Sequence, residues 1–462
     1  MCWGANNRGQ LGDGTTTNQS VPTNVLALGN EVTAISTAGY SFPEDPPSWG
    51  HTCALLAEGS AKCWGSNRDS QLGDGTLIDR TTPVEVIELG AVTSVVAGDR
   101  QNCAITTAAT VKCWGNNEYG QLGDGTTTDS ATPADVTSLS DIASVSSQGL
   151  HVCALTTAGA MKCWGFNISG QLGDDDWCSV DCTTPVDVVG LDSGVAAIDV
   201  GGIHTCALTT QGGVKCWGFN NYGQVGDGTT DRRSVPVDVK GLESGVSAIA
   251  LGGFHSCALT VEGSVKCWGF NNYGQVGDGT NTWRFTPVEV IGLTEETVAI
   301  SAGGDHTCAL AAEGTVKCWG ENFAGQLGDG STTDSATPVD VIDGASDTDN
   351  DGCTDGQELG STAVLGGARN PKSFWDFFDT PDNSNVRDRA ITIADIGRIV
   401  ARFGTTGDPA GDPLSPPPAI GYHTAFDRTP LGPELWNLGP PDGAVTIQDI
   451  GLMVAQFGHS CA

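Results

Sequence analysis

Twelve of the 17 cysteines in this 462-residue chain fall into pairs whose members are ten residues apart. The six pairs are Cys53 with Cys63, Cys103 with Cys113, Cys153 with Cys163, Cys206 with Cys216, Cys257 with Cys267, and Cys308 with Cys318. The segment between the members has the pattern of a β-hairpin, in which a glycine such as Gly212 ends a three-residue loop in the left-handed conformation. This hairpin places the two cysteines opposite each other on antiparallel strands, within reach of a disulfide bond. The sequence therefore predicts one disulfide in each repeat.

Regular disulfides indicate an oxidising compartment, so we expect the chain at the cell surface or outside the cell. The alternative is that the pairs are buried free thiols. A zinc site is not expected, because one cysteine pair in each repeat does not supply four ligands. Cys178 and Cys182, in an insertion, are close enough in sequence for a local disulfide.

Residues 347–358 carry acidic side chains at the spacing of a calcium-binding loop. Their acids occupy loop positions 1, 3, 5, 9 and 12, and a glycine stands at position 6, where the chain must turn sharply. The predicted calcium set is Asp347, Asp349, Asp351, Cys353, Asp355 and Glu358. The alternative is an acidic, solvated linker. The absence of long flanking helices makes the loop similar to the EF-hand-like calcium repeats of extracellular matrix proteins.

Residues 373–462 resemble a diverged pair of dockerin-like repeats. The segment 390–404 parallels 444–458, and each has the apolar spacing of an amphipathic helix that ends at a glycine. Weaker calcium ligands are expected at loop positions 5 and 12 of the two repeats, namely Asp388, Asp395, Asp442 and Asp449. Calcium is the one cofactor that the sequence predicts.

Three further sets of polar or aromatic residues recur once in each repeat. A histidine precedes each hairpin except the second, where Gln101 takes its place; a metal site or pH sensor is conceivable, but a structural hydrogen bond at a blade junction fits the substitution better. The aspartates of the Gly-Asp loops are expected to cap their own turns. The tryptophan of each Cys-Trp-Gly is expected to pack in the core.

Residues that differ between repeats are better candidates for binding, because the scaffold does not require them. Aromatic and arginine side chains are the usual anchors of protein interfaces. The predicted partner-binding residues are Arg232, Arg233, Trp283, Arg284, Phe285, Tyr222 and Tyr273. The alternative is ordinary loop packing. We find no catalytic constellation, so we do not expect an enzyme.

A repeat must position all of these residues. Cys-Trp-Gly occurs seven times, at steps of 61, 50, 50, 53, 51 and 51 residues, which is the period of a radial repeat. One unit predicts strands at 245–251, 255–260, 264–268 and 286–290, four to each repeat, as in a propeller blade. The chain begins in mid-repeat at Cys2, which lacks the partner expected ten residues upstream. The sequence therefore predicts an N-terminally truncated chain with one incomplete blade.

The unit Ala-Gly-x-x-His-x-Cys-Ala-Leu, followed by Gly-x-Val-Lys-Cys-Trp-Gly-x-Asn-x-x-Gly-Gln-Leu-Gly-Asp-Gly, resembles the regulator of chromosome condensation repeat family in its bacterial, cysteine-containing form. The resemblance implies an all-β fold, a seven-bladed β-propeller. We expect this propeller over residues 1–343, an EF-hand-like loop and linker over 344–372, and a small α-helical dockerin-like domain over 373–462.

The net charge of −34 disfavours nucleic acid as a partner, and no segment is long and apolar enough to span a membrane. We therefore expect a monomeric, secreted or surface-displayed scaffold that binds another protein and is tethered by a calcium-stabilised C-terminal module. The family resemblance implies guanine nucleotide exchange on a small GTPase as one alternative. The dockerin-like region implies another, an accessory module of a polysaccharide-degrading extracellular system.

Overall fold

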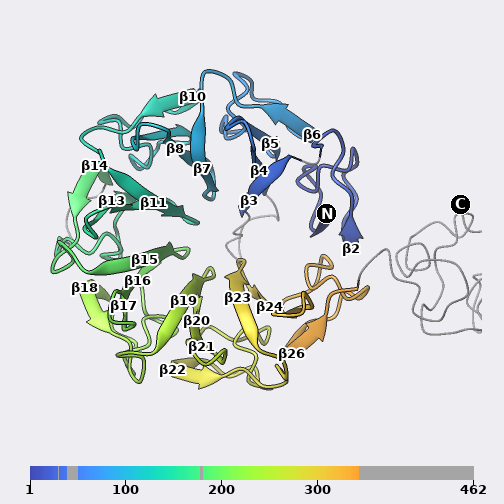
Figure 1. Ribbon diagram of the computed structural model, residues 1–462, viewed down its shortest axis with the longest axis vertical. Helices are drawn as coiled ribbons and strands as arrows, with labels where there is room; N and C mark the ends of the chain where they lie inside the picture. The colour runs from blue at the N-terminus through green and yellow to red at the C-terminus, as the bar shows by residue number, and fades with distance from the viewer. Residues whose placement is uncertain (30, 39–49, 177–180, 343–462) are drawn as a thin grey trace, which may run out of the picture. The chain divides into compact units, whose positions relative to one another are not determined.

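The structure, a computed structural model, describes residues 1–29, 31–38, 50–176 and 181–342. These residues form strands and turns and contain no helix. They make six four-stranded antiparallel sheets and one two-stranded sheet, arranged around a ring (Figure 1). The all-β propeller is thereby confirmed.

Part of the predicted organisation lies beyond these ranges. Contacts within the chain separate Met1–Val341 from Ile342–Ala462. The predicted calcium loop, the dockerin-like region and Cys178 lie outside the described residues. The calcium sites and the disulfide between Cys178 and Cys182 therefore stay predictions.

Each four-stranded sheet, called a blade here, is built from strands that follow one another in sequence. The innermost strands are β3 (Val32–Ala38), β7 (Val92–Ala97), β11 (Ile142–Ser147), β15 (Val195–Val200), β19 (Val246–Leu251) and β23 (Thr297–Ala302). The second strands are β4 (His51–Leu56), β8 (Gln101–Thr106), β12 (His151–Thr156), β16 (His204–Thr209), β20 (His255–Thr260) and β24 (His306–Ala311).

The outer half of each blade carries the Cys-Trp-Gly segment and the Pro-containing edge strand. The third strands are β5 (Ala61–Gly65), β9 (Val111–Gly115), β13 (Met161–Phe166), β17 (Val214–Gly218), β21 (Val265–Gly269) and β25 (Val316–Gly320). The fourth strands are β6 (Arg80–Glu85), β10 (Ser130–Asp135), β14 (Asp181–Asp187), β18 (Arg233–Asp238), β22 (Arg284–Glu289) and β26 (Ser335–Asp340). The two-stranded sheet pairs β1 (Cys2–Gly4) with β2 (Gln19–Thr23).

The six disulfides predicted from the ten-residue spacing are confirmed. In the β15–β18 blade, Cys206 on the second strand stands opposite Cys216 on the third, and their Cα atoms are 4.1 Å apart. The turn between them has the predicted geometry, because Gly212 has a φ of +78°. The other five bonds join Cys53 to Cys63, Cys103 to Cys113, Cys153 to Cys163, Cys257 to Cys267, and Cys308 to Cys318. Every one of them joins the two central strands of one blade, so each cross-links a single sheet.

The second blade makes the same turn with an alanine in place of the glycine. Ala109 has a φ of 57°, and its N–H donates to Thr106 O as the N–H of Gly212 donates to Thr209 O. A left-handed conformation costs a residue with a Cβ roughly 1–2 kcal/mol. We therefore expect Ala109→Gly to raise the free energy of unfolding by about 1 kcal/mol, measured by guanidinium denaturation.

Gly212→Ala is the matched reverse variant and should lose a similar amount of stability. An added Cβ at Gly212 would also lie 3.1 Å from Gly245 N. Loss of stability in Ala109→Gly would contradict the proposed strain in that turn.

The tryptophans of the Cys-Trp-Gly segments hold neighbouring blades together. The side chain of Trp217 is fully buried, and its indole Nε1 donates to Gln171 O of the preceding blade at 2.9 Å. The ring lies against Gly173, where an added Cβ would be 2.6 Å from the indole nitrogen. Six other tryptophans make the same bond at the other junctions: Trp3, Trp64, Trp114, Trp164, Trp268 and Trp319. The predicted core role is confirmed for the six that are fully buried, and Trp3 is partly buried.

Candidate interaction face

Four of the five recurring histidines join neighbouring blades through a hydrogen bond of the ring. Nε2 of His204 lies 2.9 Å from Ser256 Oγ of the next blade, and that hydroxyl donates to Gln224 O. Because the hydroxyl proton is already used, the imidazole must donate, which fixes the Nε2–H tautomer. The same pairing joins His51 to Asn102, His151 to Thr205 and His255 to Thr307. The predicted structural role is confirmed, but the partner is a side chain rather than the backbone.

Burial makes these histidines hard to charge. Burial is the main cause that lowers the pKa values of His151, His204 and His255 to about 3, and neighbouring histidines contribute to the lowering at His204 and His255. No group of three or more His, Cys, Asp or Glu side chains among the described residues is placed to hold a metal ion.

The aspartates of the Gly-Asp loops cap their own turns, as predicted. Oδ1 of Asp227 accepts the N–H of Thr229 at 2.9 Å and its hydroxyl proton at 2.7 Å. Burial acts to raise the pKa of Asp227, but the hydrogen bonds from Thr229 and Arg233 outweigh it, so the pKa is lowered.

Two of the predicted partner-binding arginines are engaged within these same loops. Arg233 binds Asp227 through Nε at 2.7 Å, and Arg284 binds Asp278 through Nη2 at 2.5 Å. Arg80 binds Asp74 in the same way in the first blade, which makes the pair a part of the loop. Arg233 and Arg284 therefore hold the loops in shape, and their guanidinium groups are already paired.

The other predicted residues gather on one face of the ring. This face contains the turn before each second strand and the loop after each third strand. Two positions meet there in each blade, because the N–H of the residue after Cys-Trp-Gly donates to the carbonyl of the residue before the histidine position. The pairs, in order around the ring, are Gly50 with Ser66, Arg100 with Asn116, Leu150 with Phe166, Ile203 with Phe219, Phe254 with Phe270, and Asp305 with Glu321.

The composition of these pairs changes from blade to blade although the backbone is the same. The β11–β14, β15–β18 and β19–β22 blades present only apolar side chains at the two positions. The β7–β10 blade presents Arg100, and the β23–β26 blade presents two carboxylates. Because this backbone hydrogen bond does not depend on the side chains, the two positions can carry different residues in each blade without a change of fold.

Six aromatic side chains form a continuous cluster, called the aromatic patch here: Phe219, Tyr222, Phe254, Phe270, Tyr273 and Trp283. Tyr222 is at its centre, with ring centroids 5.2 Å from Phe254, 5.0 Å from Phe270 and 4.9 Å from Trp283. The patch crosses the junction between the β15–β18 and β19–β22 blades. Trp283 is 38% exposed, and its Nε1 donates to Asn272 Oδ1 at 2.9 Å.

The remaining predicted residues border this patch. The guanidinium carbon of Arg232 lies 5.1 Å from the ring centre of Phe219, a cation–π distance. Phe285 is 41% exposed and packs on Gly223, where an added Cβ would be 2.4 Å from its ring. The sequence reasoning missed Phe254, Asp305 and Glu321. They could have been found from the sequence, because the residue before the histidine position differs between repeats while the residues around it are repeated.

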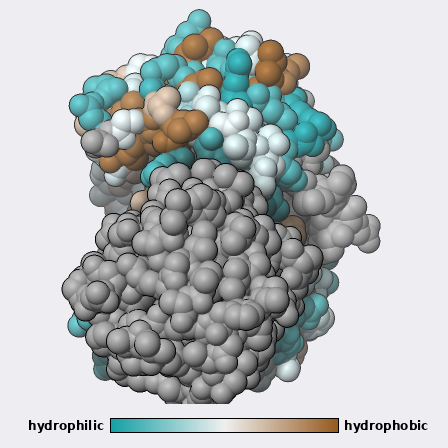
Figure 2. Space-filling model, turned by 90° about the vertical axis from the view of Figure 1, so that its right-hand side faces the viewer, coloured by the Kyte–Doolittle hydropathy of each residue, from teal (hydrophilic) through white to brown (hydrophobic). Residues whose placement is uncertain are grey.

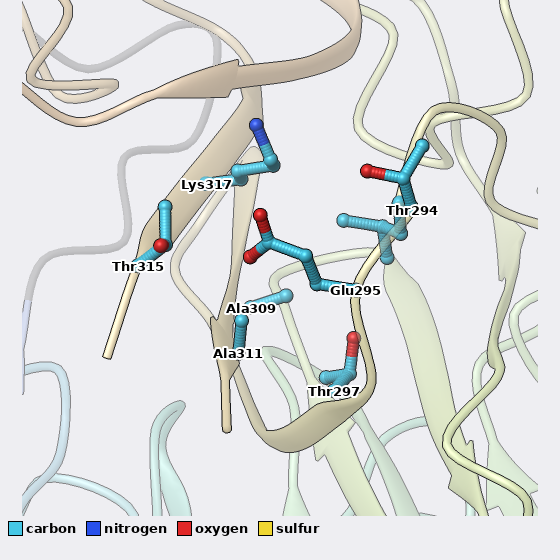
Figure 3. A pocket seen from close by; sticks show the side chains of 8 residues that line it. Thr294, Glu295, Thr297, Ala309, Ala311, Thr315 and Lys317 are labelled. Atoms are coloured by element: carbon cyan, nitrogen blue, oxygen red, sulfur yellow. The ribbon is translucent and has the colours of Figure 1, made fainter. Parts of the chain in front are cut away.

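Neither of two pockets that lie within the described part of the chain gathers a catalytic set of side chains. One lies beside β23, β24 and β25 and has a volume of about 10 Å³, which is room for one water molecule (Figure 3). The Glu295 carboxylate reaches into it between Ala309 and Lys317. Another is a shallow, polar depression of about 620 Å³ beside Asn116 and Asp129.

On the side of the molecule shown in Figure 2, the coloured residues mix hydrophobic and hydrophilic groups.

Comparisons with known proteins agree with this architecture. The family model described as "RCC1-like domain" matches residues 1–353. The ultraviolet-B receptor UVR8 of Arabidopsis thaliana is 34% identical over 149 residues, which are 31% of this chain and 34% of the receptor. The probable E3 ubiquitin-protein ligase HERC4 of Homo sapiens is 35% identical over 155 residues, which are 33% of this chain and 15% of the ligase. These matches span about a third or less of each relative.

Solved structures share the fold over most of the ring. Human WBSCR16 superposes with a TM-score of 0.64 and 25% identity, covering 74% of this chain and 94% of that one. Prp20p of Saccharomyces cerevisiae superposes with a TM-score of 0.65 and 23% identity, covering 75% and 86%. The family model matches about three quarters of this sequence, and its match includes every blade described above. The chain therefore belongs to the RCC1-like domain family of β-propellers.

Proposed function

We propose that this chain is a non-catalytic β-propeller scaffold that binds another protein through the aromatic patch. The observation that carries the proposal is the patch itself, in which six rings meet across a blade junction and Trp283 remains partly exposed. Rings already held by their neighbours lose little side-chain freedom on binding, and aromatic anchors dominate the energy of protein interfaces. Yeast RCC1 (Prp20), whose fold this chain shares, has been solved bound to Kap60.

We further propose that the chain is secreted or displayed at the cell surface. The six disulfides support this, because such bonds persist in oxidising compartments. The calcium-stabilised tether at 347–358, with the dockerin-like region that follows, remains a prediction of the sequence. No helix in the described part of the chain could cross a membrane.

We also infer that β1 and β2 are the outer strands of a seventh blade. Trp3 donates to Gln326 O across one junction and Trp64 donates to Gln10 O across the next, as at every other junction. In the two blades that flank the β1–β2 sheet, apolar side chains of the inner strands are exposed. Ile35 on β3 is 51% exposed and Leu310 on β24 is 36% exposed. Leu259, which corresponds to Leu310 in the preceding blade, is 4% exposed. Two further strands would cover these residues.

The binding proposal is tested by removing the exposed part of the patch. We expect a Trp283→Ala, Tyr222→Ala double variant to capture its partner from extracellular medium at least roughly tenfold less than the unaltered chain, which corresponds to about 1.4 kcal/mol. The measurement is the amount of each protein retained on the immobilised chain, quantified by mass spectrometry.

Val261→Ala provides the matched control. Val261 is 70% exposed and lies in the β20–β21 turn, at the end of the blade opposite the patch. Capture should be unchanged in this variant. Equal capture by the double variant and the unaltered chain would place the binding surface elsewhere.

A further inference from the structure

The aromatic patch is bordered by carboxylates on its β23–β26 side. Tyr273 continues the patch from Phe270, with ring centroids 6.1 Å apart. The negative charges of Glu321, Asp305 and Asp334 act on the Tyr273 hydroxyl, where they add to burial in raising its pKa. Asp305 and Glu321, called the acidic edge here, are the residues that replace the apolar pair of the preceding blades.

Both carboxylates of the acidic edge are held in place by amides of the scaffold. Gln275 Nε2 donates to Asp305 Oδ1 at 2.9 Å, and Gln326 Nε2 donates to Glu321 Oε2 at 3.1 Å. The glutamine recurs in every repeat. In the apolar blades, Nε2 of Gln171 and of Gln224 is buried and has no partner among the described residues. The acidic edge thus uses donors that the repeat already supplies.

No basic side chain pairs with the acidic edge within the described part of the chain. No ion pair there involves Asp305, Glu321 or Asp334. Burial, followed by repulsion from Asp305 and Asp334, raises the pKa of Glu321 to about 7. Burial raises the pKa of Asp305 to about 6. A cation placed beside the pair would relieve this repulsion.

The β7–β10 blade, on the other side of the three apolar blades, does not present a comparable group of basic residues without an acidic neighbour. Arg100 has an acidic neighbour, because its Nε lies 3.7 Å from Asp99 Oδ2. A net charge of −34 also favours a basic partner over an acidic one. Carboxylates without an ion pair among the described residues therefore gather at the acidic edge, whereas the basic Arg232 borders the patch at its Phe219 end.

We propose that the partner of this chain is a protein segment that places an apolar side chain on Tyr222 and Trp283 and a lysine or arginine beside Asp305 and Glu321. This proposal rests on the proposed function and adds the chemistry of the partner. The rings would supply most of the affinity, and the carboxylates would select the basic residue next to the anchor.

The test is a selection of random peptides displayed on phage, carried out on the purified full chain. Peptides that compete with one another for the unaltered chain should be enriched in an aromatic or large aliphatic residue close to a lysine or arginine. An Asp305→Asn, Glu321→Gln double variant keeps the shape and amide contacts of the edge. It should bind the selected peptides roughly tenfold more weakly, with the dissociation constant measured by fluorescence anisotropy.

The variants separate this proposal from the one on which it rests. Peptides that need Trp283 and Tyr222 but show no preference for basic residues, and bind the Asn/Gln variant equally, would overturn the inference and leave the binding patch in place. Peptides that bind the Trp283→Ala, Tyr222→Ala variant as well as the unaltered chain would overturn both. Circular dichroism of each variant, unchanged from that of the unaltered chain, shows that a loss of binding is not a loss of fold.

Discussion

Replacing Trp217 with alanine is expected to lower the free energy of unfolding by about 3–5 kcal/mol. The indole is fully buried and fills the junction between the β11–β14 and β15–β18 blades, so its loss leaves a cavity between two sheets. It also leaves Gln171 O without the indole N–H donor. The measurement is the midpoint and slope of guanidinium denaturation.

Two further variants separate the contributions of size and of hydrogen bonding. Trp217→Phe keeps an aromatic ring but lacks the N–H. It should lose about half as much stability as the alanine variant, because the lost hydrogen bond contributes about 1 kcal/mol and the cavity left by the smaller ring is small. Trp283→Ala removes an indole that is 38% exposed and should change stability by less than about 1 kcal/mol. If Trp217→Ala were as stable as Trp283→Ala, tryptophan packing would not hold the blades together.

Replacing His204 with glutamine is expected to make the protein less sensitive to acid. The ordinary pKa of histidine is 6.5, and burial first, then the neighbouring histidines, lower that of His204 to about 3 in the folded chain. As the pH falls below 6.5, the His204 side chain is protonated in the unfolded chain but stays neutral in the folded chain. His204 therefore removes about 1.4 kcal/mol of stability per pH unit until the pH nears 3.

The difference between the two proteins isolates this histidine. Between pH 7 and pH 4, His204→Gln should gain about 3 kcal/mol relative to the unaltered chain, measured from urea denaturation at each pH. Asp199 and Asp305 have pKa values raised to about 6, mainly by burial, so they oppose the histidines by stabilising the fold as the pH falls through 6. Both proteins contain them, so their effect cancels in the difference. If the free energies of unfolding of the two proteins changed equally with pH, His204 would not limit the stability of the protein in acid.

One blade of the repeat carries glutamine at the histidine position. In the second blade, Gln101 donates to Gly149 O and to Ser147 Oγ. The next blade has Val152 at the place where the others have the asparagine or hydroxyl that meets the histidine. A histidine at 101 would lack the side-chain partner found in the other blades, whereas the amide of Gln101 uses Gly149 O and Ser147 Oγ instead. The exchange of histidine for glutamine therefore follows from the change in its partner.

The sequence predicted the strands closely because every blade repeats the same pattern. The predicted segment 255–260 coincides with β20, and 245–251 and 264–268 differ from β19 and β21 by one residue at their ends. The edge strand β22 begins at Arg284, two residues before the prediction, because the Arg284–Asp278 pair extends the ordered loop into the strand.

The candidate site was predicted less completely, for physical reasons. Phe254 and Phe270 are far apart in sequence and meet only because a turn and a third strand return the chain to the same face. Burial is also invisible in the sequence, so the acidic edge reads as two more acids in an acidic chain. The pairing of Arg233 with Asp227 could have been found, because the same spacing of six residues joins Arg80 to Asp74.

The placement of the disulfides has a consequence for how the ring can come apart. Each of the six bonds begins and ends in the same sheet, and none of the six links one sheet to the next. Between the described sheets, apart from the single connecting peptide, packing, hydrogen bonds and an ion pair such as that between Arg8 and Asp79 resist separation. After a protease cuts one connecting loop, these six disulfides would therefore keep each blade intact but would not hold the two resulting arcs together.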